Sequence, residues 1–294
     1  MSAAPVVDVR QVRRNFARAA GTYDGVAVLQ REVGSRMLER LDYVKIAPQR
    51  VLDLGCGTGA SLGALSVRFP QAQVLGADVS AAMLRVARKQ RSRLHYLLPF
   101  LRGKKNSLLT ADALALPISS GALGMIWSNL MLHWLADPLP VFREMQRTLE
   151  VGGLLMFSTF GPDTLKELRA SFSDDYAHCQ RFTDMHDYGD MLLECGFADP
   201  VMDAEVLTMT YPSLDGLFRD LRQSGSTCAM HGRRRGLMGR SAWLAARAEY
   251  DKNMKDGRLP ATFEVVYGHA WKIEPKKTAD GSTIVRFDPK QRLR

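Results

Sequence analysis

Three glycines at alternate positions, Gly55, Gly57 and Gly59, directly follow a short apolar run. A glycine has no Cβ, so the backbone can turn tightly there and approach a bound molecule closely. An ordinary glycine-rich turn and a nicotinamide dinucleotide site share this pattern. Ala60 stands where the dinucleotide fingerprint usually has its third glycine, and the acid Asp53 precedes the turn. The turn predicts a cofactor site and leaves the cofactor open.

Three aspartates accompany three successive predicted strands. Asp53 lies in the strand before the turn, Asp78 closes the next strand about 20 residues after the turn, and Asp112 follows the third strand. Asp53 can orient a cationic amino group, Asp78 can accept hydrogen bonds from both hydroxyls of a ribose, and Asp112 can meet the exocyclic amine of an adenine. Singly, each acid is also typical of a helix cap or a turn. In this order they predict a site for S-adenosylmethionine.

These acids need a sheet that brings them to one edge. From residue 50 onward, short apolar strands alternate with helical patterns, which predicts a mainly parallel, doubly wound α/β sheet. The predicted strands cover residues 50–54, 74–78, 107–110, 123–127, 154–159, 201–210 and 262–271. The predicted helices of this part lie at residues 61–69, 80–87, 138–149, 163–170 and 183–195.

The chain is predicted to divide into five parts. Residues 9–45 repeat apolar positions at helical spacing, and two helical patterns at 211–260 separate the last two strands. We therefore expect an N-terminal helical extension (1–45), an α/β core (46–210), a helical substrate lid (211–260), a closing strand (261–275) and a basic tail (276–294). The basic stretch 91–105 is expected to be an insertion.

The core resembles the class I S-adenosylmethionine-dependent methyltransferases through residues 52–59, 76–80 with Met83, and 111–113. The resemblance implies a Rossmann-like, seven-stranded, mostly parallel sheet with helices on both faces, and S-adenosylhomocysteine as the product. The cofactor contacts that it implies are Asp53, Gly55, Cys56, Gly57, Gly59, Asp78, Val79, Met83, Asp112, Ala113 and Asn129. It leaves the methyl acceptor open, because a fold does not fix a function.

A closer resemblance extends over nearly the whole chain. The segments 16–24, 127–134, 157–160, 165–168 and 181–182 are similar to the malonyl-acyl-carrier-protein O-methyltransferases of biotin synthesis. That family implies methyl transfer to the free carboxylate of a malonyl thioester, and the methyl ester then primes pimeloyl synthesis. A malonyl carboxylate is ionised at neutral pH, so this nucleophile requires no general base.

The carboxylate does require a cation that distinguishes malonyl from acetyl, and arginine suits this role through bidentate hydrogen bonds. Arg181 is the preferred candidate and Arg143 the second, with a surface salt bridge as the alternative for each. Tyr23 matches the family's N-terminal tyrosine and is expected at the methionine end of the cofactor. Asn129 is expected at the rim of the active site, because ligands bind at the carboxyl ends of such strands.

His133 and Trp134 follow Asn129 in the sequence and are expected near the same pocket. A packing role is favoured for Trp134. The formal net charge is +9, and an acyl carrier protein is strongly acidic. We expect malonyl-acyl-carrier protein to dock on the arginines of the predicted lid, Arg233, Arg234 and Arg235, with an affinity that salt weakens. A merely solvated arginine loop is the alternative. No nucleic-acid partner is expected, because the basic groups accompany no nucleic-acid-binding motif.

No apolar run has the length of a signal peptide or of a membrane span, which predicts a cytoplasmic protein. The four cysteines are scattered and predict neither a disulfide framework nor a metal site.

Three rival functions stay open. Segments 127–134 and 163–169 also resemble a respiratory-complex assembly factor that hydroxylates a protein arginine, although the closing segment 258–267 favours the methyltransferase. A small-acid carboxyl methyltransferase would share the cofactor site. A catalytically silent nucleic-acid or carrier-protein binding module would keep the basic surface without turnover.

Overall fold

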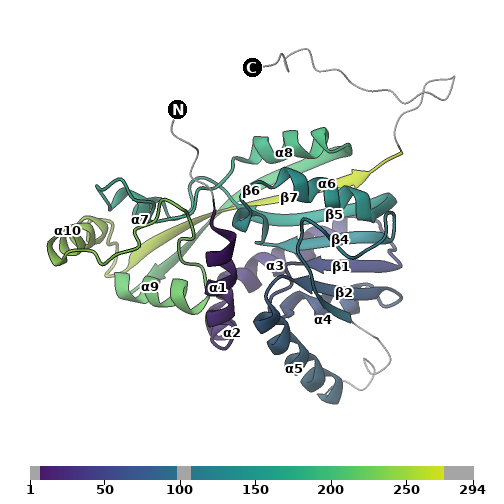
Figure 1. The fold of residues 1–294 in the computed structure, drawn as a ribbon, viewed down its shortest axis with the longest axis horizontal. Helices are drawn as coiled ribbons and strands as arrows, with labels where there is room; N and C mark the ends of the chain where they lie inside the picture. The colour runs from purple at the N-terminus through teal and green to yellow at the C-terminus, as the bar shows by residue number, and fades with distance from the viewer. Residues whose placement is uncertain (1–6, 98–106, 275–294) are drawn as a thin grey trace, which may run out of the picture.

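The computed structural model describes residues 7–97 and 107–274, and of residues 91–97 only the backbone path. The basic tail (276–294), most of the expected insertion and Lys104–Lys105 therefore lie outside the described residues. One seven-stranded sheet organises the described chain (Figure 1). Its strands are β1 (Arg50–Leu54), β2 (Gln73–Asp78), β3 (Ser107–Thr110), β4 (Leu123–Asn129), β5 (Leu149–Phe160), β6 (Phe197–Tyr211) and β7 (Leu259–Lys272).

The strand order is β3-β2-β1-β4-β5-β7-β6. The first five strands are parallel to their neighbours, while β7 runs antiparallel to both β5 and β6. Parallel strands need helical crossovers, which is why a helix intervenes between most of them. The predicted fold class, a mostly parallel seven-stranded Rossmann-like sheet with helices on both faces, is confirmed.

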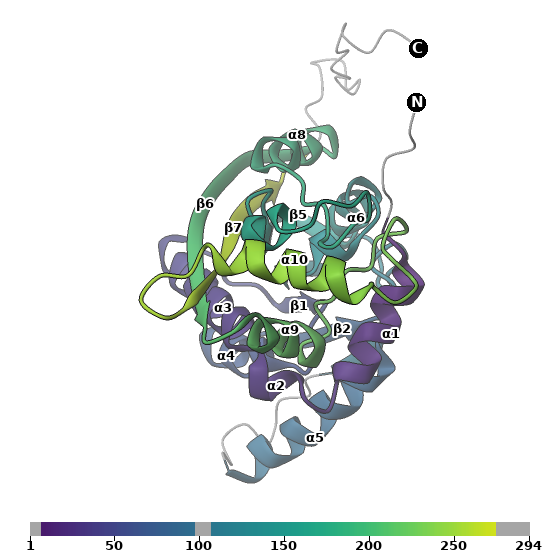
Figure 2. The same cartoon turned by 90° about the vertical axis from the view of Figure 1, so that its left-hand side faces the viewer.

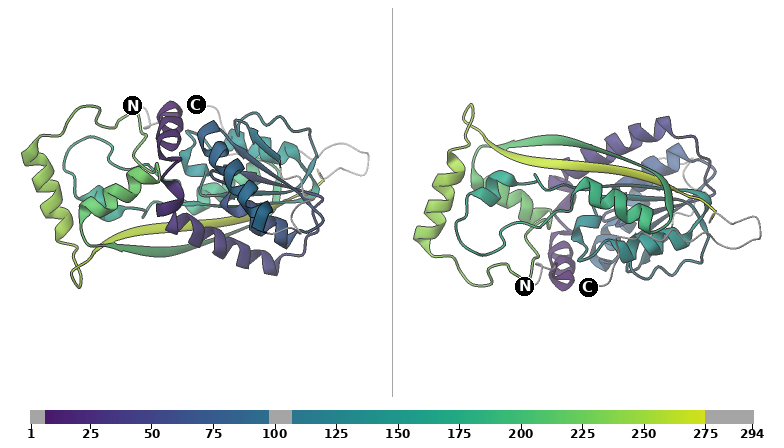
Figure 3. Two further views of the ribbon diagram at one scale, coloured as in Figure 1. Left: turned by 90° about the horizontal axis from the view of Figure 1, so that it is seen from below. Right: turned by 90° about the horizontal axis from the view of Figure 1, so that it is seen from above.

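Helices cover both faces of the sheet (Figure 3). Successive strand residues point to opposite faces, so Val51 packs with α3 (Val28–Arg40) and α4 (Ala60–Arg68), whereas Leu52 packs with α6 (Leu139–Thr148) and α8 (Met185–Glu194). Trp127 and Phe157 are buried on these two faces. Two continuous apolar layers therefore hold the sheet rigid and fix the carboxyl ends of its strands.

The sequence placed most elements correctly and misjudged some of their lengths. Helix α5 (Ala81–Leu97) continues through residues 91–97, where an insertion was expected. Strand β5 already begins at Leu149, and α7 (Lys166–Ala170) is shorter than predicted because Leu165 has a left-handed backbone with φ 54°. The strands β6 and β7 extend beyond their predicted bounds, since they pair antiparallel along nearly their whole length.

The segment between β6 and β7 contains two helices, α9 (Leu214–Gln223) and α10 (Arg240–Asp251). Figure 2 shows both helices in front of the sheet, with α1 (Val9–Ala19) beside them. The short helix α2 (Tyr23–Val26) and the longer helix α3 follow α1 and lead into the sheet. The N-terminal helices and the segment after β6 are therefore neighbours in space although they are far apart in sequence.

Several hydrogen bonds hold α1 against the segment 223–233. Asp8 N donates to Ala229 O at 2.7 Å, and Thr22 Oγ1 donates to Gln223 O at 2.8 Å. Asn15 Nδ2 adds a bond to Thr227 O at 3.3 Å. These contacts hold the N-terminal helices and the segment 223–233 together as one unit.

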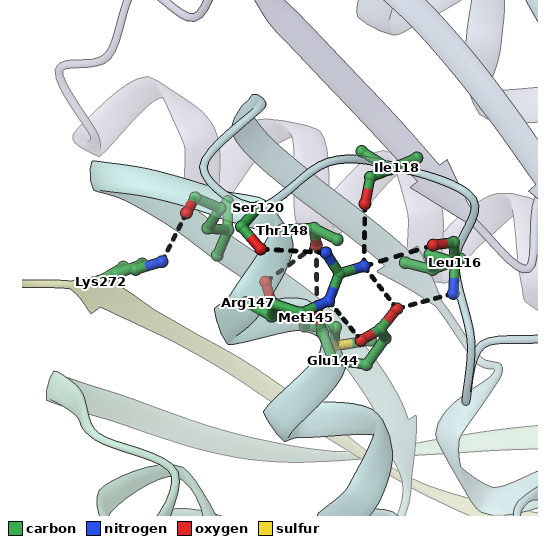
Figure 4. A network of polar contacts seen from close by, with 9 residues as sticks. Leu116, Ile118, Ser120, Glu144, Met145, Arg147, Thr148 and Lys272 are labelled. Carbon is green, nitrogen blue, oxygen red and sulfur yellow. Dashed lines mark hydrogen bonds and ion pairs between the residues drawn. The ribbon is translucent and has the colours of Figure 1, made fainter.

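Arg147 at the end of α6 anchors the loop that follows Asp112 (Figure 4). Its Nη2 donates to Leu116 O at 3.3 Å and to Ile118 O at 2.8 Å, and it pairs with Glu144 at 2.8 Å. Glu144 accepts a bond from Leu116 N at 2.7 Å, and the hydrogen bond from Arg147 lowers the pKa of Glu144. This network holds the start of the loop in place beside the sheet.

Candidate active site

A first cavity opens at the carboxyl ends of β1, β2 and β4, where ligands bind in open α/β sheets. Eight of the eleven predicted cofactor residues line it. They are Gly55, Gly57, Asp78, Val79, Met83, Asp112, Ala113 and Asn129. The structure therefore brings together three motifs that are spread over residues 52–113 of the chain.

The glycine turn is built as a backbone cradle. Gly55, Gly57 and Gly59 all have a left-handed backbone, with φ of 78°, 53° and 83°, which L side chains rarely adopt. The amides of Gly55 and Cys56 donate to Ala77 O at 2.8 and 3.0 Å, which joins the turn to β2. A Cβ on Gly57 would meet no atom within 4 Å, so this side of the turn faces open space.

Asp78 closes the turn from the end of β2. Its two carboxylate oxygens accept bonds from Gly57 N at 2.9 Å and from Ser80 N at 2.7 Å. Burial raises the pKa of Asp78, while the bonds from Ser80 and Gly57 oppose the shift. Each carboxylate oxygen has a second lone pair, so Asp78 can still accept hydrogen bonds from a molecule in the first cavity.

Three predicted cofactor residues, Asp53, Cys56 and Gly59, do not line the first cavity and lie directly behind its wall. The carboxyl group of Asp53 has no hydrogen bond or ion pair among the described residues, and burial, with the charge of Asp78 second, raises its pKa to about 8. Burial also raises the pKa of the Cys56 thiol. Gly59 caps α4 with its left-handed backbone.

The loop residue Asp112 lines the first cavity and pairs with Arg13 of α1 at 2.8 Å. Val9, Val12 and Phe16 of the same helix also line the cavity. Sequence reasoning read α1 as an amphipathic extension and missed its role as a cavity wall. The apolar positions Val12 and Phe16 were visible, but their period does not reveal which surface they face.

Asn129 and Tyr23 both line the first cavity. The Asn129 amide donates from Nδ2 to Gln30 O at 2.9 Å, and its Oδ1 accepts from Ser158 Oγ at 2.8 Å, so it links α3 to β5. Burial, with the charges of Asp78 and Asp24 after it, raises the pKa of Tyr23. The Tyr23 phenol is therefore a neutral donor at physiological pH.

A second cavity adjoins the first. Five residues line both cavities: Gln30, His133, Trp134, Phe160 and Ser226. The remaining walls come from α2, α3, α9 and the segments 160–168, 178–182 and 222–228, and they are mainly apolar and aromatic. The second cavity therefore has the shape and chemistry to hold an acceptor next to a molecule bound in the first.

His133 stands where the two cavities meet. Only 4% of its surface is exposed, and the rings of Phe160, Trp134 and Phe182 lie within 5.8 Å of its ring centroid. Burial lowers the pKa of His133 to about 3, so its ring is neutral at physiological pH. The neutral imidazole can donate from one ring nitrogen and accept at the other.

Gln180 carries a buried donor without a partner in the wall of the second cavity. Its Oε1 accepts from Ala229 N at 3.1 Å, which fixes the orientation of the amide. Its Nε2 has no hydrogen-bond partner among the described residues, and the residue is 6% exposed. A buried donor without a partner is costly, so this amide favours an oxygen-bearing ligand nearby.

The structure does not bring the two predicted arginines into either cavity. Arg143 lies on α6 and pairs with Glu194 at 2.8 Å, with 61% of its side chain exposed. Arg181 is exposed and lines neither cavity, although its neighbours Gln180 and Phe182 line the second. Arg222, at the end of α9, is the arginine among the described lining residues of the second cavity. No sequence motif marked it.

Two of the three arginines predicted for docking make contacts within the protein. Arg233 pairs with Asp8 at 3.2 Å and bonds Gln11 Oε1 at 3.1 Å, which ties it to α1. Arg234 pairs with Asp174 at 3.3 Å and lies over the ring of Tyr176. Arg235 is exposed and makes no ion pair with any residue that the structure describes.

Residues 7–97 and 107–274 contain no group of three or more histidine, cysteine, aspartate or glutamate side chains placed to hold a metal ion. No helix in the same ranges is long and apolar enough to cross a membrane.

The strand order and the glycine turn define a class I methyltransferase. A family model described as "Methyltransferase domain" matches residues 52–157. Among solved structures, the YcgJ protein of Bacillus subtilis has the same fold with a TM-score of 0.57, at 17% identity over 83% of this chain and 99% of that one.

Curated relatives narrow this class further. A malonyl-[acyl-carrier protein] O-methyltransferase of Gallionella capsiferriformans is 47% identical over 96% of this chain and 97% of its own length. The enzyme of the same name from Laribacter hongkongensis is 50% identical over 98% of this chain and 99% of its own. The chain belongs to the malonyl-[acyl-carrier protein] O-methyltransferase family.

Proposed function

We propose that this methyltransferase moves the methyl group of S-adenosylmethionine to the free carboxylate of malonyl-acyl-carrier protein. The observation that carries the proposal is the junction of the two cavities at His133, Trp134 and Phe160. A methyl donor in the first cavity and an acceptor in the second would meet there. The product would be the malonyl methyl ester that primes pimeloyl synthesis for biotin, with S-adenosylhomocysteine as the by-product.

The first cavity has the chemistry that S-adenosylmethionine requires. The open side of Gly57 leaves room for close approach, and Asp78 keeps free lone pairs for ribose hydroxyls. Asp112 can accept a hydrogen bond from an adenine amine when the Arg13 guanidinium moves away from the carboxylate. The unpaired carboxyl of Asp53 lies behind this wall and favours a nearby cation. When bound, the cofactor supplies a methyl group on a positively charged sulfur.

The surrounding residues would orient the acceptor and exclude water rather than supply a base. The carboxylate is already ionised, so in-line alignment with the methyl group is the main requirement. His133 has no acidic partner among the described residues, and burial lowers its pKa to about 3, which makes it a poor base at neutral pH. We propose that Tyr23 closes the methionine end of the first cavity and that Asn129 positions its rim through Gln30 and Ser158.

We place the cation that recognises the malonyl carboxylate at Arg222, ahead of Arg181 and Arg143. Arg222 lines the second cavity and has no ion pair among the described residues. A bidentate pair between a guanidinium and the carboxylate would be strong for malonyl and absent for acetyl. Methylation would remove the charge of the carboxylate, and this would help to release the product.

We propose that residues 211–260 form the lid over the second cavity and present a docking face to an acidic carrier protein. Arg235 is the exposed member of the arginine loop, while Arg233 joins this loop to α1. Attraction between a basic face and an acidic partner accelerates association and weakens with salt. The cytoplasmic location expected from the sequence stays a prediction.

One experiment tests the proposed reaction directly. The purified protein is incubated with S-adenosylmethionine and malonyl-acyl-carrier protein, and mass spectrometry follows the malonyl group. We expect one added methyl group, no transfer to acetyl-acyl-carrier protein, and a rate that falls as salt increases. Equal transfer to both carriers, or none to either, would be incompatible with the proposal.

A further inference from the structure

The ring of His133 lies between the two cavities with one nitrogen engaged and one free. Nδ1 lies 3.4 Å from Thr159 Oγ1, and Thr159 Oγ1 lies 3.3 Å from the hydroxyl of Tyr188. The other nitrogen, Nε2, has no hydrogen-bond partner among the described residues. His133 lines both the first and the second cavity, so its Nε2 is available to a ligand there.

Two directions are open to this chain of hydrogen bonds, because Tyr188 also bonds the side chain of Thr183. In one of them Tyr188 donates to Thr159, and Thr159 donates to Nδ1. Nδ1 is then the acceptor, and the single proton of a neutral imidazole lies on Nε2. Thr159 and Tyr188 are both buried, which shields the chain from water. This direction leaves an N–H donor on a residue that lines both cavities.

We propose that His133 binds the acceptor carboxylate through its Nε2–H at the junction of the two cavities. This inference rests on the proposed function, because it takes the acceptor to be a carboxylate. One oxygen of the carboxylate would accept from Nε2–H while the other attacks the methyl group. A neutral donor orients the carboxylate without a second full positive charge on the nucleophile. His133 would then set the position of the reacting oxygen, and Thr159 would act through His133 as a positioning residue.

The experiment compares two substitutions at this position. His133→Leu removes the donor and keeps an apolar side chain, whereas His133→Gln keeps an amide N–H. For His133→Leu we expect kcat/KM for malonyl-acyl-carrier protein to fall roughly 10- to 100-fold, the range for a lost hydrogen bond to a charged group. We expect His133→Gln to recover most of that loss. The affinity of both variants for S-adenosylhomocysteine is expected to stay within about threefold of the unmodified protein.

The control variant is His186→Leu, the same change at a side chain that is 84% exposed and lines neither cavity. It should leave kcat/KM unchanged. Thr159→Val should lower kcat several-fold with little effect on cofactor affinity, because it frees the tautomer without removing the ring. Equal losses in His133→Leu and His133→Gln, or a matching loss of cofactor affinity, would assign His133 to packing and overturn the inference.

Two further measurements decide the inference without turnover. Nitrogen-15 NMR of the histidine rings should show His133 protonated on Nε2, and protonation on Nδ1 would contradict it. Binding of malonyl-acyl-carrier protein to the protein loaded with S-adenosylhomocysteine should weaken in His133→Leu, whether or not methyl transfer is seen. A protein that binds the carrier through His133 but transfers no methyl group would retain this inference and lose the proposed function.

Discussion

The two cavities meet at the same residues, yet they are built from different parts of the protein. The first cavity includes a stretch of backbone, the glycine turn at the end of β1, which the carboxylate of Asp78 closes beside the side chains of α1. The second is formed by side chains that arrive from β5, α9 and the segments 178–182 and 222–228. Backbone at the edge of a sheet is rigid, so the first cavity should recognise one cofactor precisely. The second can change its acceptor by changing side chains.

The two cavities also differ in the charged and polar groups that line them. Acids dominate the first, with Asp78 and Asp112 in its wall and Asp53 behind it. The first also has Arg13 in its wall, and the second offers the Gln180 amide and the guanidinium of Arg222 as donors beside one acid, Asp220. A cationic methyl donor would meet acids in the first cavity, and an anionic acceptor would meet donors in the second. We expect this difference to disfavour an anionic substrate in the first cavity, and each prediction below tests it.

The largest effect is expected for Asp78→Asn. The new amide nitrogen would face the N–H of Gly57 or Ser80, so two donors would oppose each other where a bond now exists. A ribose would also lose its carboxylate acceptor. We expect the affinity for S-adenosylhomocysteine to fall on the order of 100-fold, since hydrogen bonds to charged groups contribute about 1.5–3 kcal/mol each.

Isothermal titration calorimetry measures this loss, with Asp42→Asn as the control because its side chain is 71% exposed. Binding of malonyl-acyl-carrier protein should persist in Asp78→Asn. If carrier binding and cofactor binding fell together, the two cavities would not be separable in the way their construction indicates.

Arg222→Ala should impair the second cavity and leave the first unchanged. Loss of a charge-assisted pair predicts that kcat/KM for malonyl-acyl-carrier protein falls roughly 10- to 100-fold. The affinity for S-adenosylhomocysteine should stay unchanged, because Arg222 does not line the first cavity. Steady-state kinetics with malonyl and acetyl carriers measure the effect.

Arg143→Ala and Arg181→Ala are its matched comparisons. The Arg143–Glu194 pair is largely exposed, and such pairs contribute at most about 1 kcal/mol to stability. We expect both variants to keep activity within about twofold of the unmodified protein. A large loss in Arg181→Ala with normal activity in Arg222→Ala would return the cation to the position that the sequence favoured.

The same contrast explains which parts of the site the sequence could predict. The cofactor wall of the first cavity is encoded in short motifs, because the glycine turn and each acid lie within a few residues of the strand that positions them. Eight of the eleven predicted residues line it for that reason. The second cavity joins positions such as Gln30, Phe160 and Ser226, which only the tertiary fold brings together. No local pattern of residues could have identified Arg222 or Gln180.

The contacts of the arginines expected at the docking face have a related physical cause. Arg233 and Arg234 form a basic cluster in the sequence, but their guanidinium groups pair with Asp8 and Asp174 from other segments. A charge run reveals local composition and not the partners that distant segments supply. The same holds for α1, whose apolar face was visible while the cavity that it covers was not.

Within the glycine turn, two alanine substitutions should separate stability from cofactor binding. A Cβ on Gly55 would lie 2.5 Å from Met131 Cγ and 2.7 Å from Met131 Cβ, so Gly55→Ala should destabilise the fold by about 1–3 kcal/mol. A Cβ on Gly57 would meet nothing within 4 Å, so Gly57→Ala should cost only about 1–2 kcal/mol for its left-handed backbone.

The methyl group of Gly57→Ala would instead occupy the open side of the turn and weaken S-adenosylhomocysteine binding about tenfold. Denaturant unfolding and calorimetry measure the two quantities. Cofactor affinity that is normal in Gly57→Ala would mean that no ligand approaches this turn closely.

The smallest expected effect is the release of protons when a cationic ligand binds. Burial, with the charge of Asp78 second, raises the pKa of Asp53 to about 8 in the folded protein, from 3.8 as the ordinary value. Asp53 is therefore mostly protonated at pH 7, while the stability that its raised pKa contributes is fully present below pH 3.8 and is lost as pH rises from there through 8. A bound ammonium group favours the carboxylate, lowers its pKa and releases up to about one proton at pH 7.

Calorimetry in buffers with different ionisation enthalpies measures this release, and Asp53→Asn should abolish it. If Asp53→Asn released as many protons as the unmodified protein, Asp53 would not respond to the ligand's charge. The acidic character of the first cavity would then depend on Asp78 and Asp112 alone.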